Sequence, residues 1–272
     1  MRVACVQGCA GDDMAANLDI VSAAVREAAR GGADFVTTPE NVALMAASRD
    51  RLVALSVEEG SHPAVRRFSE LASEIERWIL AGSIAVAAGD GRLSNRSILF
   101  APDGSIAARY DKIHMFDVEL PGGEVYNESK NYRPGHQGVL VDLPWGRLGM
   151  TICYDVRFPH LYRALGAAGA AFITVPSAFT KVTGKAHWTV LLRARAIETG
   201  AFVIAPAQVG RHPARRETYG HSLVVSPWGT VLLDAGEGCG VFYADIDLAE
   251  VERARNAVPA WRHAPAFELP DA

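Results

Sequence analysis

Three side chains that could carry out chemistry stand just after β-rich segments of the chain. Glu40 lies in FVTTPEN, Lys112 lies in RYDKIHMFD, and Cys153 lies in GMTICYDVRFP. A carboxylate can accept a proton, an ammonium can stabilise developing negative charge, and a thiol can attack a carbonyl carbon. Covalent acyl transfer needs these groups together. The residue types therefore predict a cysteine nucleophile, provided that the fold brings the three side chains into contact.

Each of these residues also has an ordinary structural explanation. A lone Glu or Lys at the end of a strand is most often a solvated surface charge. A Cys in an apolar strand is usually a small hydrophobic residue of the core. The three residues lie far apart in the chain, so spacing alone does not decide between the two interpretations.

Strands that alternate with amphipathic helices must position these side chains. The pattern predicts strands over residues 1–7, 33–38, 79–88, 148–153, 171–175 and 202–207, and helices over 12–30, 63–78, 159–169 and 187–199. This alternation indicates an α/β fold with a largely parallel or mixed sheet. Ligand sites of open α/β sheets collect at the carboxyl ends of strands. Glu40 follows the predicted strand 33–38, Lys112 follows a β-type segment over 106–110, and Cys153 ends the predicted strand 148–153.

Three Pro-containing turns predict antiparallel hairpins beside the parallel strands. They are PDG at 102–104, PWG at 144–146 and PWG at 227–229. Pro fits the second position of a type I turn and Gly the fourth, so we expect the sheets to be mixed. No linker or low-complexity segment divides the chain, and we predict one domain over 1–272. The tail 257–272 carries Pro and aromatic residues, and we expect it to pack on a partner subunit.

The composition is that of an ordinary globular protein. The chain has 272 residues, of which 49% are hydrophobic and 21% charged, and its net charge is −4. This balance gives no electrostatic footprint for nucleic acid or an anionic membrane, and neither is an expected partner. A local basic cluster, Arg211, His212, Arg215 and Arg216, lies in a Pro-containing loop. It is either a solvated loop or a binding element for an acidic small molecule.

The cysteines and histidines show no metal-ligand spacing. Four cysteines are too few and too scattered for a disulfide framework or a zinc site, so no metal is predicted. The N-terminal sequence MRVACVQGCAGDDM lacks the apolar core of a secretory signal. The apolar stretches fall short of the ~20 residues that span a bilayer. We therefore predict a cytoplasmic protein.

The three segments around Glu40, Lys112 and Cys153 resemble the signature blocks of the nitrilase, or carbon–nitrogen hydrolase, superfamily. The blocks occur in the family's order, and the resemblance extends over essentially the whole chain. It implies a four-layer α-β-β-α sandwich with mixed sheets, assembled as a homodimer or a higher homo-oligomer. It implies no metal and no organic cofactor. The expected ligand is a small-molecule amide.

The resemblance also implies roles for the catalytic residues. Glu40 accepts the thiol proton, Cys153 attacks the amide carbon, and Lys112 and the backbone N–H of Tyr154 hold the oxyanion. A thioester forms, ammonia leaves, and water hydrolyses the thioester. The family uses a second glutamate between the lysine and the cysteine. The Glu-Ser before a Pro-Gly selects Glu128 over Glu124 in PGGEVYNESKNYRPG.

Four further residues are expected to contact the substrate: Tyr154, Arg157, Phe179 and His187. Tyr154 and the aspartate after it replace the Trp-Glu of true nitrilases, which favours amides over nitriles. Arg157 matches an arginine that carbamoylase-like relatives use on a substrate carboxylate, although a structural salt bridge to Asp155 is an alternative. His187 could instead line the core.

The second half of the chain resembles the Nit-type amidases. The carrying segments are PSAF (176–179), AHW (186–188), LLRARAIET (191–199), GRH (210–212), YGHS (219–222) and PWGT (227–230). Within this group the resemblance is greater to the branch that hydrolyses deaminated glutathione than to the ω-amidases. Lys181 departs from the pattern and could reshape the pocket. The alternatives are an ω-amidase for α-ketoglutaramate, an N-carbamoyl amino acid hydrolase, and a catalytically silent binding protein.

Overall fold

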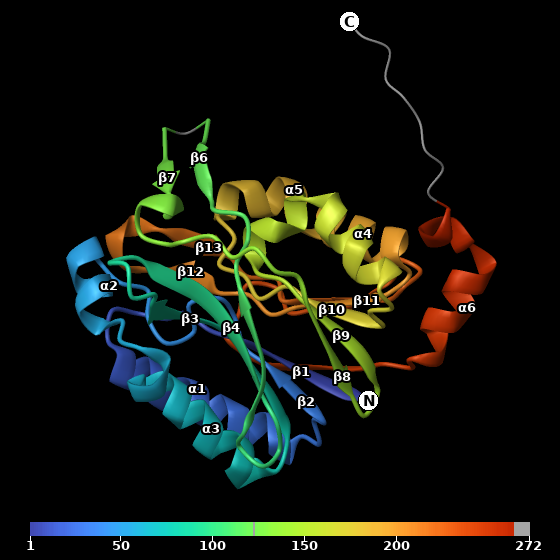
Figure 1. The fold of residues 1–272 in the computed structure, drawn as a ribbon, viewed down its shortest axis with the longest axis horizontal. Helices are drawn as coiled ribbons and strands as arrows, with labels where there is room; N and C mark the ends of the chain where they lie inside the picture. The colour runs from blue at the N-terminus through green and yellow to red at the C-terminus, as the bar shows by residue number, and fades with distance from the viewer. Residues whose placement is uncertain (122, 264–272) are drawn as a thin grey trace, which may run out of the picture.

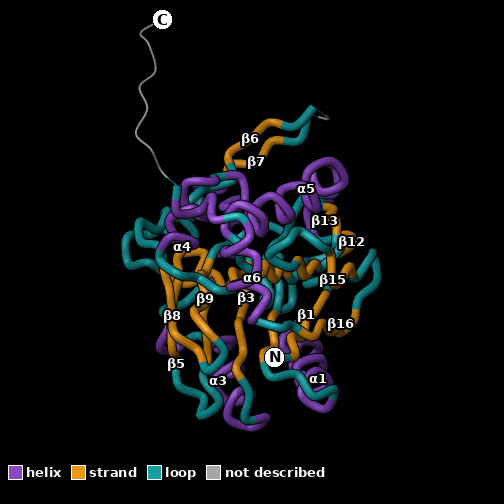
Figure 2. The backbone as a smooth tube through the Cα atoms, turned by 90° about the vertical axis from the view of Figure 1, so that its right-hand side faces the viewer, coloured by secondary structure: helices purple, strands orange, loops and turns teal. Residues whose placement is uncertain are grey.

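The protein, a computed structural model that describes residues 1–121 and 123–263, is built in four layers (Figures 1 and 2). Two six-stranded sheets lie face to face in the middle. Helices α1 (Met14–Arg30) and α3 (Pro63–Ile75) cover the outer face of the first sheet. Helices α4 (Pro159–Ala167) and α5 (Lys181–Thr199) cover the second. The predicted α-β-β-α sandwich is confirmed.

The first sheet comes mainly from the N-terminal part of the chain. Its strand order is β16-β1-β2-β3-β4-β5; β1, β2 and β3 are parallel, and the outer pairs are antiparallel. The strands are β1 (Arg2–Gln7), β2 (Phe35–Thr37), β3 (Trp78–Ala87), β4 (Leu93–Phe100), β5 (Ile106–Asp111) and β16 (Gly240–Asp245). In the chain, α1 and α3 connect the parallel strands, as parallel neighbours require.

The second sheet repeats this plan. Its strand order is β15-β14-β11-β10-β9-β8, with β9, β10 and β11 parallel. The strands are β8 (Val139–Leu143), β9 (Gly146–Met150), β10 (Phe172–Thr174), β11 (Phe202–Ala205), β14 (Leu223–Val225) and β15 (Val231–Asp234). Both sheets therefore have three central parallel strands with antiparallel strands on either side, and both are mixed, as predicted.

Shorter elements gather at one end of the layers. They are α2 (Arg49–Leu55), the arm β6 (Asp117–Glu119) and β7 (Val125–Asn127), and the hairpin β12 (Val209–Arg211) and β13 (Glu217–Tyr219). All of them lie on the left of Figure 1, whereas α6 (Ala249–Ala257) lies at the opposite end. Residues of α2, of β7 and of the loop between β12 and β13 line the cavity described below.

The facing surfaces of the two sheets form the largest core. Val3 of β1 packs there, whereas the next residue, Ala4, packs beneath α1 and α3. Such alternation is expected of a strand that is covered on both faces. Phe35 and Phe172 meet across the sheets with their ring centroids 6.2 Å apart, edge to face. Burial of each such side chain stabilises the fold by about 1.5–3 kcal/mol.

The structure confirms the three predicted hairpins and shifts several of the predicted element boundaries. PDG joins β4 to β5, and the two PWG turns join β8 to β9 and β14 to β15. The strand predicted over 148–153 ends at Met150, because the backbone turns sharply at Cys153. The helix predicted over 187–199 begins at Lys181. Gly184 lies within this helix, where a Cβ would overlap the ring of Tyr219.

Several short elements have too little hydrophobic periodicity to be predicted from the sequence. The strands of the β6–β7 arm have three residues each, and α6 buries a single side chain, Val251. Of the tail 257–272, residues 264–272 lie outside the described residues, so the predicted packing on a partner subunit stays a prediction. None of the helices in the described ranges combines the length and hydropathy that a membrane crossing requires.

Candidate active site

The loop that carries Glu40 follows β2 and is fixed by a bulge in β3. The N–H of Ser83 donates to the carbonyl of Pro39 (3.3 Å), and the Ser83 hydroxyl accepts from the N–H of Asn41 (2.9 Å). A Cβ at Gly82 would overlap the carbonyl oxygen of Pro39, so the close approach of β3 to this loop needs glycine. These contacts hold Glu40 in one buried position.

Cys153 lies at a tight turn after β9. Its φ is 47°, in the left-handed region, and the 3-10 helix Cys153–Arg157 begins there. A non-glycine residue adopts this conformation only where its surroundings impose it. The buried carboxylate of Asp155 fixes the turn by accepting hydrogen bonds from the N–H of Ile152 (2.9 Å), the hydroxyl of Tyr110 (2.6 Å) and the N–H of His114 (3.0 Å). The turn brings the thiol to the cavity.

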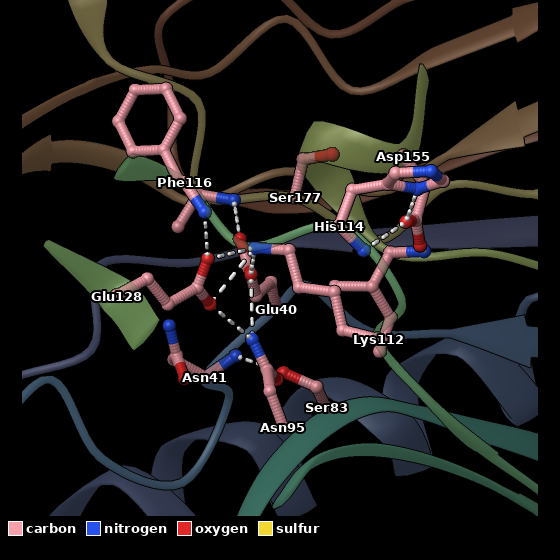
Figure 3. A network of polar contacts seen from close by, with 12 residues as sticks. Glu40, Asn41, Ser83, Asn95, Lys112, His114, Phe116, Glu128, Asp155 and Ser177 are labelled. Carbon is pink, nitrogen blue, oxygen red and sulfur yellow. Dashed lines mark hydrogen bonds and ion pairs between the residues drawn. The ribbon is translucent and has the colours of Figure 1, made fainter. Parts of the chain in front are cut away.

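Lys112 joins two glutamates at the end of β5. Its ammonium lies 2.9 Å from Glu40 Oε1 and 2.8 Å from Glu128 Oε2. The side-chain amide of Asn95, on β4, donates to the same carboxylates, at 2.9 Å to Glu40 and 3.1 Å to Glu128. Glu128 also accepts from the N–H of Phe116 at 2.7 Å. Figure 3 shows the ammonium and the amide between the two carboxylates.

The charges of this cluster decide its protonation. Burial raises the pKa of the Cys153 thiol, and the Glu40 carboxylate raises it further. Burial also acts to raise the pKa of Glu40, but the charges of Lys112 and Arg216 outweigh it and lower that pKa below its usual value. The pKa of Lys112 is raised well above its usual value, since Glu128 and Glu40 outweigh the opposite effect of burial. At neutral pH a neutral thiol lies beside an ionised carboxylate and an ammonium.

The thiol and the carboxylate lie close enough for each to shift the pKa of the other. Glu40 Oε1 accepts from Lys112 and Asn95, and Glu40 Oε2 accepts from the N–H of Ala178 at 2.8 Å. The side chains are almost inaccessible to solvent: Glu40 and Lys112 are 2% exposed and Cys153 is 6% exposed. A proton can therefore pass from the thiol to the carboxylate without bulk water.

The cluster forms the floor of a cavity of about 630 Å³, within the range of small-molecule sites. Its walls come from the loop before α2, from the β6–β7 arm and from the turns after β9, β10 and β12. Three arginines line it: Arg49, Arg215 and Arg216. The predicted residues Glu40, Lys112, Glu128, Cys153, Tyr154 and Phe179 all line it too.

Two predicted substrate-binding residues are not among the residues that line this cavity. Arg157 lies with its Nη1 3.3 Å from His187 Nδ1, and its guanidinium is 5.1 Å from the ring centroid of Phe179. The alternative interpretation, an ion pair between Arg157 and Asp155, is not formed either, because Asp155 takes its hydrogen bonds from other groups. Lys181 faces Glu217 at 3.8 Å, outside the cavity.

Of two further residues of the site, Asn95 was not predicted from the sequence, and Arg216 was predicted only as one member of a basic cluster. Asn95 bridges Glu40 and Glu128, but a single Asn in a strand gives no sequence signal for such a role. Arg216 belongs to the predicted basic cluster, yet only the structure separates it from Arg211. Arg216 lines the cavity and donates to the carbonyl of Ala178 at 2.6 Å, whereas Arg211 is exposed and pairs with a surface glutamate.

The four-layer fold and the Glu, Lys and Cys that meet at one cavity define a class of hydrolases. Residues 2–256 match the sequence pattern of the family described as "Carbon-nitrogen hydrolase", and the chain belongs to this family. Its reaction class is the hydrolysis of carbon–nitrogen bonds other than peptide bonds, in amides. No group of three or more His, Cys, Asp or Glu within residues 1–121 and 123–263 could hold a metal ion.

Several proteins of known sequence or structure that resemble this chain are amidases. The chain is 41% identical over 267 residues to a protein of Yersinia enterocolitica named "Deaminated glutathione amidase", covering 96% of this chain and 92% of that protein. The solved NitFhit protein of C. elegans superposes with a TM-score of 0.90 at 34% identity, covering 97% of this chain but only 64% of that longer one. An amidase from Nesterenkonia sp. AN1 superposes with a TM-score of 0.81 at 26% identity, covering 95% and 98% of the two chains.

Proposed function

We propose that Cys153 hydrolyses a linear amide through a thioester, with Glu40 as proton acceptor and donor and with Lys112 as the cation that stabilises the oxyanion. The observation that carries this proposal is the meeting of three buried groups at one cavity, the Cys153 thiol, the Glu40 carboxylate and the Lys112 ammonium paired with it. The Nesterenkonia amidase, in a glutamate-to-glutamine mutant, bears acrylamide added to its active-site cysteine. This supports the choice of nucleophile.

The first half of the reaction forms the thioester. Glu40 takes the proton of the Cys153 thiol while sulfur attacks the amide carbon. The charge on the carbonyl oxygen is held by the Lys112 ammonium and by the N–H of Tyr154, which lies in the first turn of a 3-10 helix and so has no acceptor within that helix. Glu40 then gives the proton to the leaving nitrogen, and the carbon–nitrogen bond breaks.

The second half regenerates the enzyme. Glu40 takes a proton from a water molecule that attacks the thioester carbon, and the proton returns to sulfur as the acid leaves. Glu128 positions Lys112 throughout, since its oxygens accept at 3.0 and 2.8 Å. Because two carboxylates face one ammonium, the pKa of Lys112 is raised and the ammonium stays charged throughout the neutral pH range.

The substrate class follows from charge and from the relatives. We propose an α-keto acid ω-amide, with deaminated glutathione as the first candidate, because relatives at about 40% identity carry that name. Arg216 is the residue that binds the carboxylate of the acyl part of the substrate. It lines the cavity, its charge acts on Glu40, and its Nε is buried without a hydrogen-bond partner in the described residues.

The leaving group depends on the amide. A primary amide such as α-ketoglutaramate releases ammonia. In deaminated glutathione the amide nitrogen belongs to cysteinylglycine, so that dipeptide leaves instead. Both reactions pass through the same acyl group on Cys153 and differ only in the amine that Glu40 protonates.

The test compares the purified protein with Cys153→Ala. Wild type is expected to release cysteinylglycine from deaminated glutathione, and the variant is expected to lose roughly 10⁴-fold or more of the activity. Asp155→Asn is not a suitable control because it disturbs the same turn; Cys5→Ala is suitable, since Cys5 is buried in the sheet core away from the cavity. Activity that survives Cys153→Ala would reject this mechanism.

We also propose that two copies of the chain associate through α5. Val182, Val190 and Ile197 of this helix are 55%, 68% and 56% exposed and recur at helical spacing, and the exposed Trp228 lies in the turn beside Ile197. Such an apolar stripe favours an interface. Val190→Asp combined with Ile197→Asp should convert a dimer into a monomer in sedimentation velocity; an unchanged mass would exclude this face.

A further inference from the structure

Two exposed arginines stand at the mouth of the cavity. Arg49 begins α2, and Arg215 precedes β13; both line the cavity. Neither forms an ion pair with a carboxylate in the part of the chain that the structure describes; the side-chain partner of Arg49 there is the amide oxygen of Asn131, at 2.9 Å. By contrast, Arg211 on the same hairpin as Arg215 pairs with Glu217.

The backbone of Arg215 adopts an unfavourable conformation at the mouth of the cavity. Its φ is 61°, in the left-handed region, which costs free energy for any residue that has a Cβ. The acid that shares the mouth is Glu124, which accepts from the hydroxyl of Tyr126 at 2.9 Å. With Arg49 and Arg215 against Glu124, the mouth has a net positive charge.

The carboxylates at the floor of the cavity are neutralised without the arginines of the mouth. Glu40 and Glu128 are balanced there by Lys112 and Arg216. The arginines of the mouth are therefore available to an anion that enters from outside. A guanidinium matches a carboxylate with two parallel hydrogen bonds.

The chemistry places a defined part of the substrate at the mouth. Once Cys153 carries the acyl group, that part of the substrate stays at the floor, and the amine must depart through the opening. A substituent on the amide nitrogen therefore lies between the floor and the mouth. A dipeptide spans about 7 Å when extended, and a cavity of about 630 Å³ has room for it beyond a five-carbon acyl group.

We infer that Arg49 and Arg215 bind a carboxylate on the leaving group. The preferred substrates are then secondary amides whose amine is the N-terminus of a short peptide with a free C-terminal carboxylate. This inference rests on the proposed function, since it assigns the leaving-group side of the same site. Arg216 binds the carboxylate of the acyl part, and Arg49 and Arg215 bind the carboxylate of the leaving amine.

The experiment uses three substrates with one acyl group: deaminated glutathione, its C-terminal amide, and α-ketoglutaramate. For Arg49→Gln and Arg215→Gln we expect KM for deaminated glutathione to rise roughly tenfold each, the loss of one hydrogen-bonded charge contact, with kcat unchanged. KM for the C-terminal amide and for α-ketoglutaramate should not change. Arg211→Gln is the matched control on the same hairpin, and it should leave all three values as in wild type.

Three results would overturn the inference. One is a wild type that hydrolyses the C-terminal amide as efficiently as deaminated glutathione. Another is a rise of KM that is the same for all three substrates, and the last is no change in either variant. In each case the wild type still cleaves the amides, so the proposed function stands. A wild type that cleaves none of the three rejects the proposed function itself.

Discussion

The floor of the cavity is buried and densely hydrogen-bonded, whereas its mouth is exposed and holds two arginines that pair with no acid within residues 1–121 and 123–263. At the floor, Lys112 and Asn95 both contact Glu40 and Glu128. At the mouth, Arg49 and Arg215 are open to solvent. Preorganised buried charges stabilise a transition state, while exposed flexible cations select what binds. The difference indicates that chemistry and recognition are separate in this molecule, and the variants below test that separation.

The largest expected effect at constant shape is that of Glu40→Gln. The amide cannot accept the thiol proton, so kcat should fall by up to roughly 10⁴-fold. Glu124→Gln is the matched change at the mouth and should leave kcat within about twofold, since the hydrogen-bond partner of its side chain among the described residues is the hydroxyl of Tyr126. Steady-state kinetics with one amide substrate measure kcat for both variants and compare the two losses. Equal losses would contradict the distinction between floor and mouth.

Lys112→Met should have the next largest effect. It removes the charge that stabilises the oxyanion, which is expected to lower kcat by roughly 10²–10³-fold. It also leaves two buried carboxylates without their cation, and the loss of a buried partner destabilises a fold by about 3–5 kcal/mol. Chemical denaturation measures the second effect and single-turnover kinetics the first. A Lys112→Met variant that is destabilised but keeps a normal kcat would show that the cluster is ordinary ion pairing.

Asn95→Ala tests whether the floor needs both of its bridging groups. It deletes a donor to Glu40 and Glu128, and we expect kcat to fall roughly tenfold, the loss of one hydrogen bond to a charged group. Asn131→Ala, at the mouth, is the control and should change KM rather than kcat. A positioning role also predicts that the acidic limb of the pH profile moves, since Glu40 loses a group that favours its ionised form. An unmoved limb would limit Asn95 to packing.

Arg216→Gln should raise KM, because the acyl carboxylate loses the cation proposed to bind it, and should also shift the pH profile, which is the smallest of the expected effects. Glu40 accepts a proton only when ionised, and the charges of Lys112 and Arg216 lower its pKa. Activity is therefore lost as pH falls through that lowered pKa, and removal of the Arg216 charge raises the pKa and moves the acidic limb of kcat/KM to higher pH. Circular dichroism over the same pH range separates this shift from unfolding. A limb that stays in place, or moves to lower pH, would contradict the assigned electrostatics.

Much of the fold could be predicted from local chemistry. The Pro and Gly of the three turns dictated hairpins, and the alternation of apolar residues placed the central strands and most of the helices. The ends of elements were less certain, because tertiary contacts decide them. Gly184 lies inside α5 and not at its end, and a side chain there would overlap Tyr219, a contact that the local sequence does not reveal.

The site was predictable where residue type and family pattern agreed. Glu40, Lys112, Glu128 and Cys153 line one cavity, although their catalytic roles stay proposals. Asn95 could not be found, because its role depends on the pairing of β3, β4 and β5 and not on its neighbours in sequence. Arg157 was expected at the substrate, yet it lies outside the residues that line the cavity, beside His187.

The central claim is that the acyl group passes through Cys153. Its most direct test is mass spectrometry of protein quenched with acid during turnover of deaminated glutathione, followed by proteolysis and sequencing of the modified peptide. We predict an α-ketoglutaryl thioester on the peptide that contains Cys153, and none on the peptides that contain Cys9 or Cys239, the exposed thiols. An acyl group on another residue, with Cys153 unmodified, would contradict the account.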